Sequence, residues 1–172
     1  CAWDAPNARA HVLGNLPFAI STELLLKWIR LIPSRSGPFK FGRVPLTLLF
    51  QKEVAYRLFA KSSTSDYGRL SVMSQHCATV HKKFDIRGSS FVPKPDVDAG
   101  VVTLVPLVEP LVNVNQASLE YVLRKVFGQR RKILKNSVSS LEFGDEILTE
   151  SGLDEKLRPD QTTVKQWGAL AN

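Results

Sequence analysis

Short apolar runs alternate with amphipathic segments of helical period over the first 107 residues, and this alternation constrains the fold more than any other feature of the chain. Apolar runs predict strands at residues 11–14, 46–50, 80–86 and 101–105. Helical periodicity predicts helices at residues 21–32, 52–61 and 70–78. Strands that alternate with helices form mostly parallel sheets, so this part is predicted to be α/β. The last two strands have no helix between them, and we expect them to pair antiparallel at one edge.

Two local features refine these elements. Ser21 stands just before the periodic apolar residues of the first helix, so its hydroxyl is predicted to cap that helix. The run at residues 11–14 ends at Gly14 and is predicted to be a buried strand.

After residue 107 the pattern becomes helical throughout. An amphipathic helix is predicted from the spacing of five apolar residues, Leu119, Val122, Leu123, Val126 and Phe127. A second helix is expected at about residues 130–141, and shorter helical pieces near residues 146–151 and 164–171. The sequence therefore predicts two domains, an α/β part at residues 1–107 and a small all-helical part at residues 108–172.

The charge of the chain indicates an anionic partner. The formal net charge is +7 and the pI is about 9.6, and such an excess of cations is typical of nucleic-acid binding. Residues 116–137 hold six cations against Glu120 alone. Arg130, Arg131 and Lys132 fall at the predicted start of a helix, where cations oppose the helix dipole. That placement favours an external anion, although a solvated helix start is the alternative.

Several classes of protein are disfavoured. Cys1 and Cys77 have no metal-ligand spacing and form no disulfide framework, so we expect no metal site and a reducing compartment. No stretch is apolar for long enough to span a bilayer. The chain begins with Cys1 rather than Met, and we expect it to be a fragment or a processed product.

The sequence Asn15-Leu16-Pro17-Phe18, which follows the first predicted strand, suits chemistry on an exocyclic amine. The adenine amine is a poor nucleophile because its lone pair is delocalised into the ring. Two acceptors on its hydrogens, the Asn15 side chain and the Leu16 main-chain carbonyl, would localise that lone pair. Pro17 stiffens the loop, and Phe18 offers a face on which an extruded base can stack. An ordinary strand-ending turn is the alternative for these four residues taken alone.

This loop resembles the Asn/Asp-Pro-Pro-Tyr/Phe loop of the amino-methyltransferases, and its Leu narrows the resemblance to the ribosomal RNA adenine N6,N6-dimethyltransferase (KsgA-like) family. Further segments look like characteristic stretches of that family and occur in the same order, at residues 50–55, 67–73, 91–98, 127–132 and 157–159. The last two argue against the antibiotic-resistance methyltransferases that act on large-subunit RNA. Residues 37–43 look like the animal mitochondrial branch, which is also known as mitochondrial transcription factor B.

The resemblance implies a fold, a reaction and partners. Residues 1–107 would be the C-terminal half of a Rossmann-like class I methyltransferase domain, and residues 108–172 a helical domain that binds RNA and positions the substrate. Family members use S-adenosylmethionine to dimethylate two adjacent adenines in a hairpin loop near the 3′ end of small-subunit ribosomal RNA. We expect a monomer that acts on the assembling small subunit in the mitochondrial matrix, with a cytoplasmic or nucleolar location as the alternative.

The same resemblance assigns the site residues. Asn15, Leu16, Pro17 and Phe18 would form the catalytic loop, with Asn15 also beside the cofactor, and Phe91 would sandwich the adenine with Phe18. The predicted RNA-binding residues are Arg130, Arg131, Lys132 and Lys135. The family's glycine-rich cofactor loop would lie before Cys1, so we expect these 172 residues alone to bind S-adenosylmethionine poorly and to be inactive. A non-catalytic ribosome-assembly or mitochondrial transcription factor with the same fold is the alternative.

Overall fold

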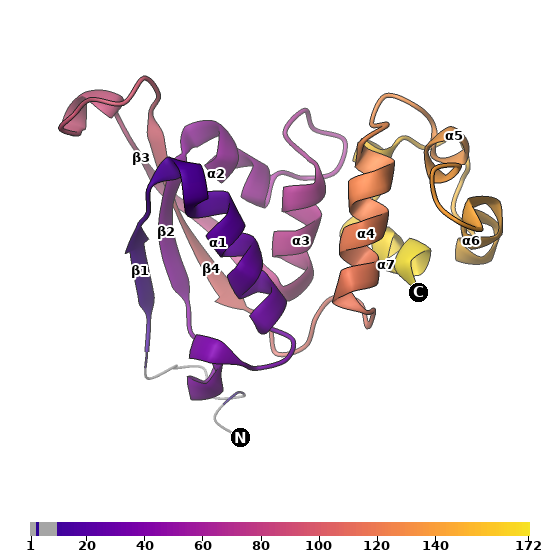
Figure 1. Cartoon of the computed structure of the whole chain (residues 1–172), viewed down its shortest axis with the longest axis horizontal. Coiled ribbons are helices and arrows are strands. Elements are labelled where there is room, and N and C mark those ends of the chain that lie inside the picture. The colour runs from indigo at the N-terminus through magenta and orange to yellow at the C-terminus, as the bar shows by residue number, and fades with distance from the viewer. Residues whose placement is uncertain (1–2, 4–9) are drawn as a thin grey trace.

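The computed structural model describes Trp3 and residues 10–172, which form a sheet covered by helices and, beside it, a second group of helices (Figure 1). The strands are β1 (Val12–Asn15), β2 (Leu46–Gln51), β3 (Ala78–Ile86) and β4 (Ala99–Pro106). The helices of the first part are α1 (Phe18–Leu31), α2 (Lys52–Phe59) and α3 (Arg69–Cys77). The second part holds α4 (Gln116–Phe127), α5 (Leu134–Val138), α6 (Gly144–Ser151) and α7 (Val164–Ala171).

The sheet has the strand order β1-β2-β4-β3. β1 and β2 are parallel, whereas β4 is antiparallel to both of its neighbours. The predicted antiparallel pairing of the last two strands is confirmed, and β3 forms the edge. The expectation of a mostly parallel sheet is wrong for the described strands, because β3 returns into β4 through a loop and β4 inserts beside β2.

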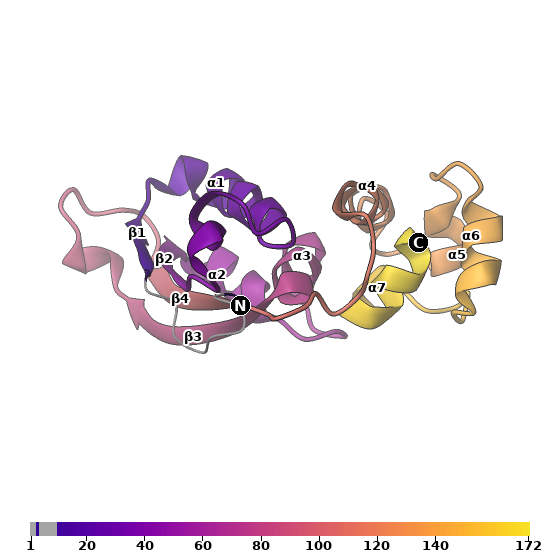
Figure 2. The ribbon, with the colours of Figure 1, turned by 90° about the horizontal axis from the view of Figure 1, so that it is seen from below.

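The helices α1, α2 and α3 lie on one face of the sheet (Figure 2). On the other side of α3, α4 and α7 pack against it, and the buried apolar residues of the two parts form one continuous cluster. An aromatic chain crosses this junction, with ring centroids 6.3 Å apart for Tyr67 and Phe127 and 5.0 Å apart for Phe127 and Trp167. Arg30 of α1 also donates two hydrogen bonds to Glu120 of α4, at 2.9 and 2.7 Å. The division at residue 107 stays a prediction.

Three local predictions are wrong. β1 is not buried, since Leu13 is 76% exposed at the open edge of the sheet. Ser21 does not cap α1, which already begins at Phe18; the buried Ser21 hydroxyl donates to the Phe18 carbonyl at 3.0 Å. The helix expected at residues 130–141 is reduced to α5, because residues 128–132 form a turn.

Among the helices at residues 10–172, none is both long enough and apolar enough to cross a bilayer. Within the same part of the chain, His, Cys, Asp and Glu side chains do not gather in groups that could hold a metal ion.

Candidate active site at one edge of the sheet

Four chain segments meet at a single edge of the sheet. β1 and β2 are parallel, so their carboxyl ends, Asn15 and Gln51, lie at the same edge. Ala99, the first residue of β4, is opposite Gln51 in the register, and it also pairs with Ile86 at the end of β3. The short loop after β1 and the loop of residues 87–98 therefore leave the sheet side by side. Ligands of open α/β sheets bind outside the carboxyl ends of the strands.

A hollow of about 210 Å³ opens between these two loops. Its lining joins the predicted catalytic loop to the predicted second aromatic and comprises Asn15, Leu16, Pro17, Phe18, Leu49, Phe91, Val92, Pro93 and Pro95. All five residues predicted for amine and base recognition thus line one cavity, although Phe91 is far from Phe18 in the sequence. Their roles in catalysis stay predictions.

Phe18 and Phe91 form apolar walls of this hollow. Both side chains are partly buried, and both pack against a small cluster of buried residues, Leu49, Ala99 and Val101. This cluster is separate from the main core. The cluster therefore supports the two rings from behind while part of each ring stays accessible.

The first turn of α1 fixes the shape of the predicted catalytic loop. Pro17 has φ −55° and ψ 132°, and its carbonyl accepts hydrogen bonds from the amides of Ile20 and Ser21 at 3.1 and 3.2 Å. Asn15 is exposed. Neither its side chain nor the Leu16 carbonyl has a hydrogen-bond partner among the described residues. Both acceptors are therefore free for a ligand.

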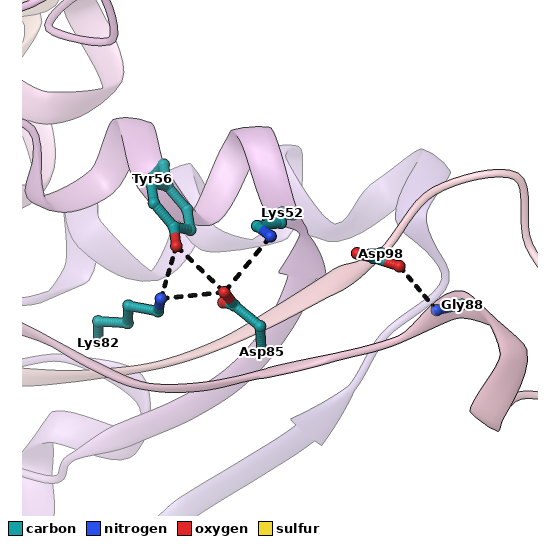
Figure 3. Close-up of polar contacts among 6 residues, drawn as sticks. All are labelled: Lys52, Tyr56, Lys82, Asp85, Gly88 and Asp98. Atoms are coloured by element: carbon teal, nitrogen blue, oxygen red, sulfur yellow. Dashed lines mark hydrogen bonds and ion pairs between the residues drawn. The ribbon is translucent and has the colours of Figure 1, made fainter.

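A polar cluster that the sequence did not predict lies at the base of the 87–98 loop (Figure 3). The Asp85 carboxylate accepts hydrogen bonds from Lys82 Nζ at 3.0 Å and from the Tyr56 hydroxyl at 3.1 Å, and Lys52 Nζ is 3.6 Å away. Hydrogen bonding from Lys82 holds the pKa of Asp85 below its usual value, and hydrogen bonds to Tyr56 and Asp85 raise the pKa of Lys82.

The predicted RNA-binding cations differ in their surroundings. Arg130 donates to the Thr64 carbonyl at 3.1 Å and lies 3.8 Å from Asp160. Lys135 forms an ion pair with Glu155 at 2.9 Å.

Arg131 and Lys132 are exposed, and within the described residues neither charged side chain has an acidic or hydrogen-bonding partner. The three cations at 130–132 lie in the turn between α4 and α5 rather than within the first turn of a helix. The predicted helix start at residue 130 is thus wrong, and exposure without an acidic partner is the better argument for an external anion at Arg131 and Lys132.

Comparison with known proteins gives a consistent result. The family described as "Ribosomal RNA adenine dimethylase" matches residues 3–172. "Dimethyladenosine transferase 1, mitochondrial" of Vermamoeba vermiformis is 56% identical over 162 residues, which cover 93% of this chain and 47% of that protein. The Homo sapiens protein of the same name is 40% identical over 177 residues, which cover 99% of this chain and 51% of that protein. The chain spans about half the length of these curated relatives.

Two solved structures have a similar fold. A dimethyladenosine transferase from Plasmodium falciparum superposes with a TM-score of 0.76 at 23% identity, over 98% of this chain and 68% of that one. The 23S rRNA methyltransferase ErmE superposes with a TM-score of 0.57 at 20% identity, over 98% of this chain and 67% of that one. The predicted Rossmann-like α/β class is confirmed, as is the predicted mitochondrial branch of the family.

Proposed function

Because the chain belongs to the ribosomal RNA adenine dimethylase family, we propose that it captures and activates the target base in an S-adenosylmethionine-dependent enzyme. The reaction is the N6-dimethylation of two adjacent adenines in a hairpin loop near the 3′ end of mitochondrial small-subunit ribosomal RNA. One observation carries the proposal. The residues that carry two free carbonyl acceptors, Asn15 and Leu16, line the same hollow as two supported phenylalanine rings, and one of these, Phe91, is far away in the sequence.

The hollow suits a flipped adenine. Its lining is apolar except for Asn15, so an extruded base can stack on Phe18 and Phe91. Base–aromatic stacking contributes about 1–3 kcal/mol for each base in nucleic-acid complexes. The Asn15 amide oxygen and the Leu16 carbonyl then accept the two hydrogens of the adenine amine and localise its lone pair on nitrogen. Among the described residues no titratable side chain lines the hollow, and water is the acceptor that we propose for the proton that the amine loses.

The residues present fit only the reacting end of the cofactor. When bound, S-adenosylmethionine supplies an electrophilic methyl group, and Asn15 at the exposed end of β1 is the residue that would border it. The hollow has no carboxylate in its lining with which to hold a ribose. Within these residues, Asn15 therefore connects the cofactor side to the base side, and Phe18 and Phe91 serve the base alone.

RNA binding is proposed for the helical part, and first of all for Arg131 and Lys132. These two side chains are exposed and have no acidic partner among the described residues. Arg130 lies beside Asp160, and Lys135 forms an ion pair with Glu155. The partner is the hairpin within the assembling small subunit, and the protein acts on it as a monomer.

A methyl-transfer assay tests the proposal. The full-length gene product is supplied with labelled S-adenosylmethionine and a hairpin that has two adjacent loop adenines, beside a hairpin with guanines in their place. Asn15→Ala is expected to lower the transfer rate at least about 100-fold, a loss typical of removing one preorganised polar group at a reacting centre, while RNA affinity is unchanged.

The control is Asn113→Ala, which removes the same side chain from an exposed position in the segment between β4 and α4. Full activity in Asn15→Ala would refute the two-acceptor mechanism. Hairpin binding without any methyl transfer by the unsubstituted protein would instead favour the non-catalytic assembly or transcription factor.

A further inference from the structure

The loop that bears Phe91 is fixed at its base by a polar clamp, which we define as Lys52, Tyr56, Lys82, Asp85 and Asp98 (Figure 3). Besides the contacts of Asp85, Lys82 Nζ donates to the Tyr56 hydroxyl at 2.6 Å. Asp98 Oδ1 accepts a hydrogen bond from the Gly88 amide at 3.0 Å and so closes the loop on itself. The amide of Lys52 donates to the Asp98 carbonyl at 2.9 Å. Lys52 thus contacts Asp85 before the loop and Asp98 at its end.

A β-bulge makes this clamp possible. In a regular strand, residues three apart point to opposite faces of the sheet. In β3, Lys82 is opposite Val102 but Phe84 is opposite Val101, so Lys83 is an extra residue. The extra residue shifts the alternation by one position, and Lys82 and Asp85 therefore point to the same face, toward α2. Bulges of this kind commonly redirect a side chain beside an active site.

A glycine brings α2 close enough to complete the clamp. Gly100 of β4 is opposite Asp85 in the register. A Cβ atom built on Gly100 would lie 2.7 Å from the Cβ of Ala55, which is in the middle of α2. With any larger residue at this position, α2 would have to move away from the strand, and with it Lys52 and Tyr56.

The clamp is too exposed to be needed for folding. The Asp85, Lys82 and Lys52 side chains are 27%, 35% and 45% exposed, and ion pairs at such positions add little to stability. β3 is already held by its ladder with β4 from Ala78 to Ile86. Beyond that ladder the clamp ties the polypeptide on either side of Phe91, so its effect is local to the loop.

We propose that Lys52, Tyr56, Lys82, Asp85 and Asp98 are positioning residues, which hold the 87–98 loop so that Phe91 faces Phe18 across the hollow before RNA binds. This inference rests on the proposed function for its catalytic consequence. The clamp touches neither base nor cofactor and acts through the placement of Phe91 alone. Misplacement of a substrate-orienting group by about 1 Å can lower a rate about 100-fold.

The test compares adjacent lysines of β3 in the full-length gene product. Lys82→Met breaks the clamp, Lys82→Arg keeps the charge and the donors, and Lys83→Met removes the same charge from the exposed bulge residue next to it. Methyl transfer to the adenine hairpin gives kcat and KM, amide hydrogen exchange reports protection of residues 87–98, and thermal unfolding reports stability.

We expect Lys82→Met to lower kcat about 10- to 100-fold and to speed exchange at residues 87–98. KM for RNA should change no more than in Lys83→Met, because each variant loses one cation. Lys82→Arg should restore both kcat and protection, and Lys83→Met should match the unsubstituted protein in both. The thermal midpoint should stay the same in all three variants.

Each other outcome overturns the inference. If Lys82→Met and Lys83→Met lose the same activity, charge alone matters and the clamp does not. A loop that loosens without any change in kcat would remove its catalytic role. If the unsubstituted protein transfers no methyl group, the proposed function fails, but hydrogen exchange still tests whether the clamp holds the loop. Unchanged protection of residues 87–98 in Lys82→Met would refute that role of the clamp, and lost protection would support it.

Discussion

Replacing Trp167 is expected to unfold the two parts of the chain together. Its side chain is fully buried, and its ring lies 5.0 Å from that of Phe127 at the junction between them. A tryptophan buries roughly 150–250 Å², which at about 25 cal/mol per Å² corresponds to about 4–6 kcal/mol. Measured losses for Trp→Ala in cores are about 3–5 kcal/mol, and we expect Trp167→Ala to lower the free energy of unfolding by that amount.

The assay is urea unfolding followed by far-ultraviolet circular dichroism and by tryptophan fluorescence. A single transition that moves to lower urea in both signals is expected, because one cluster of buried residues runs through both parts. Trp167→Phe should cost less, and Tyr121→Ala, an exposed aromatic of α4, should cost under about 0.5 kcal/mol. Two separated transitions, with only one of them shifted, would refute the reasoning and make residues 108–172 an independent domain.

Three further predictions concern charge, pH and packing. Arg131→Gln with Lys132→Gln should weaken hairpin binding and reduce the slope of log K against log salt by about 1.4, as measured by filter binding over a salt series. Burial lowers the pKa of His76, so at mildly acidic pH the unfolded chain binds a proton at this residue more readily than the folded chain does. The free energy of unfolding should therefore be highest above about pH 6.5 and fall as the pH drops below that value, which urea midpoints at several pH values would measure. Gly100→Val should lower the unfolding free energy by about 1–3 kcal/mol because its side chain meets Ala55, as urea unfolding would measure.

Matched substitutions control these three measurements. Arg130→Gln with Lys135→Gln removes the same charge from cations that already have acidic partners, so a smaller change in salt slope is expected. An equal change in salt slope for the two double variants would show that exposed cations without acidic partners contribute no more to RNA binding than paired cations do. His76→Gln should flatten the stability profile below pH 6.5, and an unaltered profile would place its cause elsewhere. Gly68→Ala has open space around the new atom and should cost less than Gly100→Val.

The four residues at the end of β1 that line the hollow were predictable because their signals are local. Asn15-Leu16-Pro17-Phe18 is a contiguous segment whose polar, rigid and aromatic members follow a strand. Phe91 followed from the family resemblance alone, since no sequence pattern relates it to Phe18. The structure supplies the missing relation: β4 pairs with β2, which pairs with β1, and the 87–98 loop therefore lies beside the carboxyl end of β1.

Other features could not be predicted because they depend on tertiary contacts. Hydrophobic periodicity carries through residues 130–141, yet the amides of Gln129 and Lys132 bind carbonyls three residues back and form a turn there. The polar clamp was missed for a similar reason, because its geometry requires a bulge at Lys83 that depends on pairing with β4. The one-residue shift at this bulge decides which face of the sheet the Asp85 side chain occupies. The hydrophobic periodicity of a single strand does not reveal such a shift.

The two walls of the hollow are held in different ways, and this difference bears on how a base is captured. Phe18 begins α1 directly after Pro17, so main-chain geometry fixes it. Phe91 lies in the middle of a long loop, and ordering each residue of such a loop costs about 1–2 kcal/mol. Contacts that order the loop before RNA arrives offset that cost in the free protein and leave more of the stacking energy for binding. The exposed ion pairs at the loop base therefore matter less for the stability of the fold than for the preformed distance between two aromatic rings.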